Sequence, residues 1–184
     1  AEKLLPFDTV FIVNRFLSAV SQAVMECGGQ PNQFVGDGLL ALFGLATGPE
    51  TACRQAIRAA AAIAVNVDEL NRFLGHDLQE PIRFGIGIHG GEVIIGDIGY
   101  RDHMVFTALG DAVNVAARLQ DMTKTLECEV VLSDDVRKTA RLSLDAANEL
   151  TVTIRGRAEA MVVQSITDAK MLSAIADDAG PVAA

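Results

Sequence analysis

The sequence lacks the features that mark three large classes of protein. Its three cysteines, Cys27, Cys53 and Cys128, form no C-x-x-C pair, so neither a disulfide framework nor a zinc site is indicated, and a reducing, cytoplasmic setting is expected. Lys and Arg number 15 against 24 Asp and Glu, without a basic cluster. This argues against a nucleic-acid binder, because clustered positive charge supplies affinity for the phosphate backbone. No run of about 18 apolar residues occurs, so the chain is not expected to insert into a membrane.

What the sequence does contain is enough apolar character for one packed domain. Of its 184 residues, 50% are hydrophobic and 21% are charged, which is the composition of a globular protein that folds without disulfides. We expect residues 1–168 to form one domain and residues 169–184 to form a loose C-terminal tail.

Apolar residues spaced three and four apart predict three long helices. They cover residues 8–27, 49–74 and 110 to about 122. A brief fourth helix is predicted to begin at Ser133, a residue type that caps helix N-termini.

Short apolar and β-branched segments between these helices predict strands. Residues 33–43 read as a hairpin around Gly36-Asp37-Gly38, and segments 82–88 and 92–98 read as a second hairpin around His89-Gly90-Gly91. Further strands are predicted at the ranges 130–132, 150–155 and 160–166.

The order of these elements predicts an α+β fold in which helices cover one face of a mainly antiparallel sheet. It fits a ferredoxin-like core that lacks its first strand.

Asp37 is the first candidate functional residue. The flanking glycines leave its carboxylate with little steric bulk, as a site for one or two Mg²⁺ ions carrying a triphosphate requires. The alternative is that Asp simply favours this turn.

Two further candidate groups carry positive charge. Asn114 and Arg118 are four residues apart on one predicted helix face, so an amide and a cation could reach the same sugar-phosphate. Arg155-Gly156-Arg157 lies at a predicted turn, where a guanidinium could neutralise a leaving pyrophosphate. The alternatives are a solvated helix face and a solvated basic turn, and His89 is expected to form a structural hydrogen bond.

Four segments together resemble the catalytic domain of class III adenylate and guanylate cyclases, in the bacterial type with Thr at a base-selecting position. They are QFVGDGLLALFG at 33–44, GIHGGEV at 87–93, FTALGDAVNVAARL at 106–119 and IRGR at 154–157. The match runs in order along nearly the whole chain.

The resemblance implies that the ribose 3′-hydroxyl of ATP attacks the α-phosphate with the help of two Mg²⁺ or Mn²⁺ ions. Asp37 would hold metal, Asn114 would orient the ribose and Arg118 would stabilise charge at the transferring phosphate. Arg157 stands where the family uses Lys toward the terminal phosphates. Active sites in the family lie between the subunits of a dimer, so a homodimer would hold two sites.

The resemblance also implies that Gln33 and Thr107 select the base. Thr107 fits the bacterial subclass that reads adenine, whereas Gln33 replaces the usual Lys and can donate or accept through its amide. An adenylate cyclase is therefore predicted. A guanylate cyclase and a catalytically silent dimerisation or regulatory module are the alternatives.

The family carries its other metal-binding aspartate on a strand that is expected to precede Ala1. The chain alone is therefore expected to bind Mg-ATP poorly. The pattern would fit the cytoplasmic domain of a longer, membrane-anchored protein.

Overall fold

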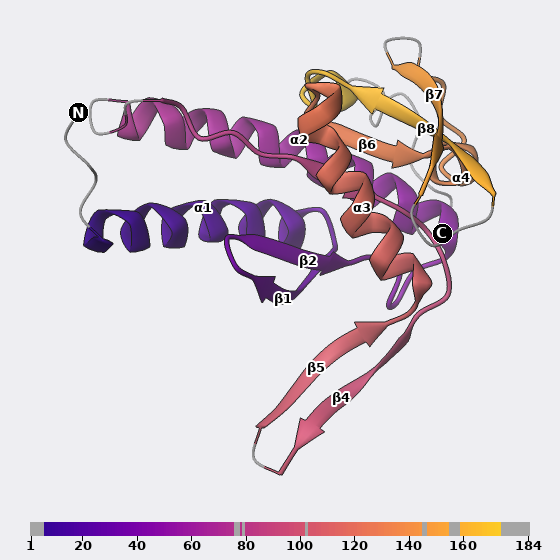
Figure 1. Cartoon of the computed structure of the whole chain (residues 1–184), viewed down its shortest axis with the longest axis horizontal. Helices are drawn as coiled ribbons and strands as arrows, with labels where there is room; N and C mark the ends of the chain where they lie inside the picture. The colour runs from indigo at the N-terminus through magenta and orange to yellow at the C-terminus, as the bar shows by residue number, and fades with distance from the viewer. Residues whose placement is uncertain are drawn as a thin grey trace.

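The computed structural model describes residues 6–75, 78, 80–101, 103–144, 147–154 and 159–173. The mixed α+β fold predicted from the sequence is confirmed, with helices packed on mainly antiparallel strands (Figure 1). In chain order the elements are α1 Pro6–Glu26, β1 Gln30–Val35, β2 Gly38–Leu42, α2 Pro49–Leu74, β3 Ile86–Ile88, β4 Ile94–Tyr100, β5 His103–Leu109, α3 Asp111–Leu126, β6 Val130–Ser133, α4 Asp134–Thr139, β7 Asn148–Thr153 and β8 Ala160–Ile166.

The two longest helices, α1 and α2, lie side by side (Figure 1). Val20 and Val24 of α1 are buried against Ile63 and Val67 of α2. Asn66 ties the pair together by donating a hydrogen bond of 3.0 Å from Nδ2 to the Ala19 carbonyl. Within the part of the chain that the structure describes, no helix is long and apolar enough to cross a membrane.

A four-stranded sheet in the order β3-β6-β8-β7 forms the centre of the fold. Strands β3 and β6 run parallel, and the other two pairings are antiparallel. Val130 and Leu132 of β6 pack into the cluster that includes α2, while Val131 packs with Val115 of α3. Because alternate residues of a strand point to opposite faces, helices cover both faces of β6. The prediction that helices cover one face is therefore wrong.

The predicted hairpin around Gly36-Asp37 is confirmed as β1–β2. Val35 pairs with Gly38, which leaves a two-residue turn, and Gly36 has a φ of +62° that glycine adopts without strain. The register shifts between Pro31 and Gln33, so Asn32 is an extra residue in β1 and forms a bulge.

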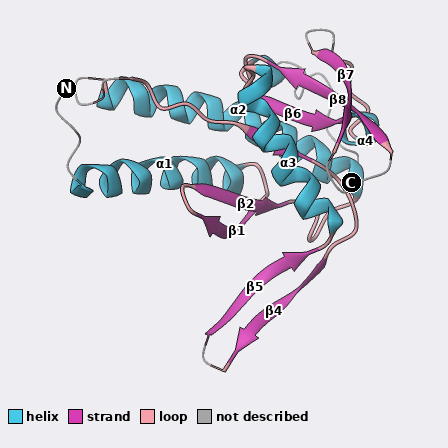
Figure 2. Cartoon of the chain, viewed as in Figure 1, coloured by secondary structure: helices cyan, strands magenta, loops and turns pink. Residues whose placement is uncertain are grey.

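The predicted pairing of residues 82–88 with 92–98 is wrong. Ile86–Ile88 instead lies parallel to β6, and Ile94–Tyr100 pairs antiparallel with β5, a strand that the sequence pattern did not predict. The central sheet offers β3 a fully buried neighbour, which outweighs a local hairpin across two glycines. Strands β4 and β5 form a two-stranded arm that projects from the body (Figures 1 and 2).

The packed core continues past the expected domain boundary. Ala169 and Leu172 are 0% and 1% exposed and belong to the cluster around α2 and β6. Residues 169–173, the described part of the expected loose tail, therefore pack against the core through Ala169 and Leu172.

Candidate functional site

The structure brings Gln33 and Thr107 together, although 74 residues separate them in the sequence. The Thr107 hydroxyl donates to Gln33 Oε1 at 3.1 Å, which joins β1 to the arm strand β5. Gln33 is exposed and Thr107 is half-buried, so both polar groups remain accessible to a ligand. The two positions expected to select a base are thus neighbours on one surface.

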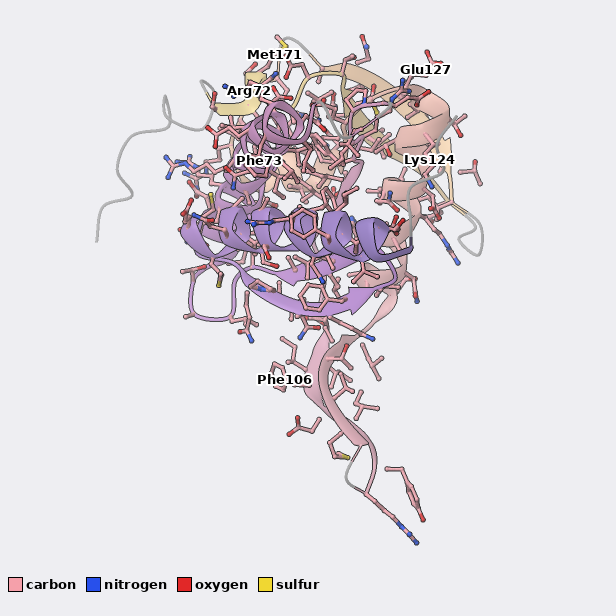
Figure 3. All side chains as sticks on the ribbon, turned by 90° about the vertical axis from the view of Figure 1, so that its left-hand side faces the viewer. Arg72, Phe73, Phe106, Lys124, Glu127 and Met171 are labelled. Carbon is pink, nitrogen blue, oxygen red and sulfur yellow. The ribbon has the colours of Figure 1, made fainter. Side chains whose placement is uncertain are left out.

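Asn32, which the sequence analysis did not single out, lies beside this pair. Its Nδ2 donates to the Phe106 carbonyl at 3.1 Å, and its Oδ1 accepts from the Thr107 hydroxyl at 3.5 Å. Figure 3 shows Phe106 on the arm, below the β1–β2 hairpin. No sequence signal marks Asn32, because its contacts depend on a bulge and on the approach of β1 to β5, which only the fold creates.

Asp37 occupies the turn between β1 and β2, as the sequence predicts. Its side chain is exposed and makes no hydrogen bond or ion pair with any residue that the structure describes. A side chain at Gly36 would meet nothing within 4 Å, so space next to the carboxylate is open. The turn points away from α3 (Figure 1).

Asn114 and Arg118 both lie on α3, one turn apart, as expected. Val115 and Leu119 anchor the helix with 0% exposure, which leaves Asn114 exposed and Arg118 half-buried beside them. Gly87 of β3 lets the helix approach closely, since a Cβ there would lie 2.1 Å from the Ala116 carbonyl oxygen. The position of the Asn114–Arg118 face therefore depends on this helix–strand contact.

Arg157 and its neighbour Arg155 lie outside the described residues. Within the described ranges, no group of three or more His, Cys, Asp or Glu side chains gathers to hold a metal ion. Among the described residues, Asp37 is therefore not part of a preformed cluster of metal-binding side chains.

His89 faces a shallow hollow of about 220 Å³ at the start of α3, together with Glu92 and Asp111. Its Nδ1 lies 2.9 Å from Ser133 Oγ, so the hydroxyl expected to cap α4 contacts this ring instead. This contact agrees with the expected structural hydrogen bond of His89.

Comparison with known proteins identifies the family. The family described as the adenylate and guanylate cyclase catalytic domain matches residues 1–166, so the chain belongs to it. Members of this family are lyases that cyclise nucleotides.

Individual relatives agree with this assignment. An adenylate cyclase of Anabaena cylindrica is 28% identical over 169 residues, which are 90% of this chain and 34% of that protein. The solved guanylyl cyclase Cya2 superposes with a TM-score of 0.78 at 25% identity, covering 90% of this chain and 83% of that one. A bacterial light-regulated adenylyl cyclase superposes with a TM-score of 0.72 at 28% identity, covering 97% of this chain and 52% of that one. The chain spans about a third or less of the curated relatives, at 34%, 8% and 26% of three of them.

Proposed function

We propose that this domain is an adenylate cyclase that converts ATP into 3′,5′-cyclic AMP and pyrophosphate. The contact between Gln33 and Thr107 carries the proposal, because it assembles a hydrogen-bonding pair for a purine edge on an accessible surface. An adenylate cyclase of Anabaena cylindrica among the relatives adds support. A cytoplasmic setting, where ATP is abundant, is part of the proposal.

Asp37 is the proposed metal ligand on this chain. Mg²⁺ retains several waters and is usually bound by one or two carboxylates plus substrate phosphates, so one exposed carboxylate fits an ion that arrives with a triphosphate. Two such ions, Mg²⁺ or Mn²⁺, would polarise the phosphate oxygens and favour loss of the 3′-hydroxyl proton.

Two residues of α3 supply positioning and charge. The ribose 3′-oxygen forms a bond to the α-phosphorus, and the bond from that phosphorus to the bridging oxygen of pyrophosphate breaks. Asn114 orients the ribose, and Arg118 stabilises the charge that builds up at the α-phosphate. Arg157 is proposed to bind the terminal phosphates.

The site is proposed to form between two copies of the chain. The Asp37 turn points away from α3, so an ATP between two chains could meet Asp37 of one and Asn114 and Arg118 of the other (Figure 1). The arm supplies a surface for pairing, since Ile94, Tyr100 and Leu109 are 77%, 70% and 54% exposed. Exposed apolar residues in such number mark interaction surfaces.

A guanylate cyclase is the second candidate, favoured by the similarity to the guanylyl cyclase Cya2. The Gln33 amide can present either its oxygen or its nitrogen, so the pair could also face guanine. The assay below separates the two bases.

The test is to incubate the full-length protein with ATP or GTP and Mn²⁺ and to measure both cyclic products. Cyclic AMP should exceed cyclic GMP, and Asp37→Ala and Asn114→Ala should each reduce it at least about 100-fold. Asp121→Ala changes an exposed carboxylate on α3 and should leave activity intact.

Mixing the two inactive variants tests the shared site. A mixed dimer keeps one site with both Asp37 and Asn114, so about a quarter of the activity should return. Failure of the mixture to recover activity would contradict a site between subunits. No product from either nucleotide would favour the silent regulatory module instead.

A further inference from the structure

Asn32 occupies an unusual place in β1. Successive residues of a strand normally point to opposite faces, yet Asn32 and Gln33 both contact Thr107. The register shift between Pro31 and Gln33 accounts for this, because a bulge re-aims a side chain. Bulges of this kind occur preferentially beside active sites.

The hydrogen bond to the arm fixes the orientation of the Asn32 amide. Nδ2 donates to the Phe106 carbonyl at 3.1 Å, so Oδ1 is turned toward the Thr107 hydroxyl, 3.5 Å away. An amide oxygen only accepts, and Gln33 Oε1 is a second acceptor on the same side at 3.1 Å. The single hydroxyl hydrogen of Thr107 is therefore drawn toward β1.

This direction decides what the pair presents to a ligand. With its hydrogen engaged, Thr107 offers lone pairs, and Gln33 with its oxygen occupied offers the Nε2 donor. A donor facing N1 and an acceptor facing the 6-amino group match adenine. Guanine presents the reverse pattern, an N1–H donor and an O6 acceptor, and would leave both ends mismatched.

We infer that Asn32 is a positioning residue that strengthens the preference for adenine over guanine, because its Oδ1 joins Gln33 Oε1 in keeping the Thr107 hydroxyl hydrogen turned toward β1. The inference rests on the proposed cyclase function and adds a residue to its specificity. Asn32 acts through Thr107, so its effect on base choice depends on that hydroxyl.

The experiment measures kcat/KM for ATP and for GTP in the full-length protein, with Mn²⁺, and follows their ratio. Asn32→Ala should lower the ATP-to-GTP ratio about three- to tenfold, the worth of one neutral hydrogen bond. The double variant Asn32→Ala/Thr107→Val should have the same ATP-to-GTP ratio as Thr107→Val alone.

Two further variants separate orientation from folding. Asn32→Asp keeps an acceptor for Thr107 but loses the donation to the Phe106 carbonyl that aims the side chain, so it should retain only part of the ratio. Asn66→Ala removes a comparable amide-to-carbonyl hydrogen bond between α1 and α2 and should not change the ratio.

Several outcomes overturn the inference. An unchanged ratio in Asn32→Ala, in a protein that makes cyclic AMP, removes the inference and leaves the proposed function standing. An equal fall in the Thr107→Val background shows that Asn32 does not act through Thr107. Absence of any cyclic product from the unaltered protein removes the proposed function, and the inference with it.

Discussion

Strand β6 and the β4–β5 arm both carry large apolar residues but have opposite surroundings. Val130, Val131 and Leu132 of β6 are each 0% exposed, between helices on both faces. The arm also contains many large apolar residues, yet Ile94 and Leu109 are 77% and 54% exposed. Apolar strand residues therefore do not by themselves predict burial within the chain.

This difference in burial distinguishes residues that stabilise the fold, as in β6, from exposed residues that a partner could contact, as in the arm. The body buries its strands by helix packing, and its stability should respond to any lost methyl group. The arm contacts the body near its base, where β1 meets β5, and presents its apolar side chains outward (Figures 1 and 3). Changes there should alter association and activity rather than folding.

The largest effect is expected from one matched pair of leucines. Leu132→Ala in β6 should lower the free energy of unfolding by about 2–5 kcal/mol, because a fully buried side chain leaves a cavity. Leu109→Ala in the arm should cost less than about 1 kcal/mol, since that side chain is 54% exposed. Urea unfolding of each variant checks the difference, and equal losses would contradict the distinction between body and arm.

A charge on the arm should produce the next largest effect, on activity. Val105→Glu places a carboxylate among the exposed apolar residues of β5 and should lower cyclic AMP formation about 100-fold by preventing dimers. Sedimentation of the variant should show a monomer whose unfolding midpoint is close to that of the unaltered protein.

The control is a valine on the body with similar exposure. Val65 on α2 is 43% exposed and Val105 is 49% exposed. Val65→Glu should leave both the dimer and the activity intact. If Val105→Glu remains an active dimer, the arm is not the pairing surface.

Regions whose structure is determined by neighbouring residues could be predicted from the sequence, whereas regions determined by long-range contacts could not. Local signals predicted α2, with bounds 49–74 as observed, and the Gly36-Asp37 turn. The parallel pairing of β3 with β6 joins residues about 44 positions apart, and nothing local to residues 82–88 encodes it. The sequence pattern does not predict strand β5, because apolar and polar residues do not alternate regularly in HMVFTAL.

The candidate site divides in the same manner. Motif resemblance found Asp37, Gln33, Thr107, Asn114 and Arg118, and spacing placed the last two on one face of α3. The hydrogen bond between Gln33 and Thr107, and the contacts of Asn32 beside it, depend on the three-dimensional approach of β1 to β5. The sequence therefore supplies the candidate residues, whereas the fold shows that two of them, Gln33 and Thr107, lie together.

The smallest effect concerns a buried charge in the body. Asp134 is 6% exposed, and its carboxylate accepts from Arg137 at 2.6 Å and from Lys138 at 2.8 Å. Arg137, then Lys138, lowers the pKa of Asp134 to about 2. A lowered pKa stabilises the fold above the ordinary value of about 3.9, and this contribution disappears as the pH falls from about 4 toward 2.

Asp134→Asn should therefore lower the free energy of unfolding at pH 7 by about 1–2 kcal/mol. The loss is smaller than for a fully buried ion pair, because Lys138 is largely exposed and water weakens its attraction to Asp134. Urea unfolding at pH 7 and pH 3 should show the gap between variant and unaltered protein shrinking at the lower pH. Asp97→Asn on the exposed arm should produce no gap at either pH. If the difference in free energy of unfolding between Asp134→Asn and the unaltered protein stays constant with pH, the loss comes from packing and not from charge. The contrast between Asp134 in the body and Asp97 on the arm would then not be electrostatic.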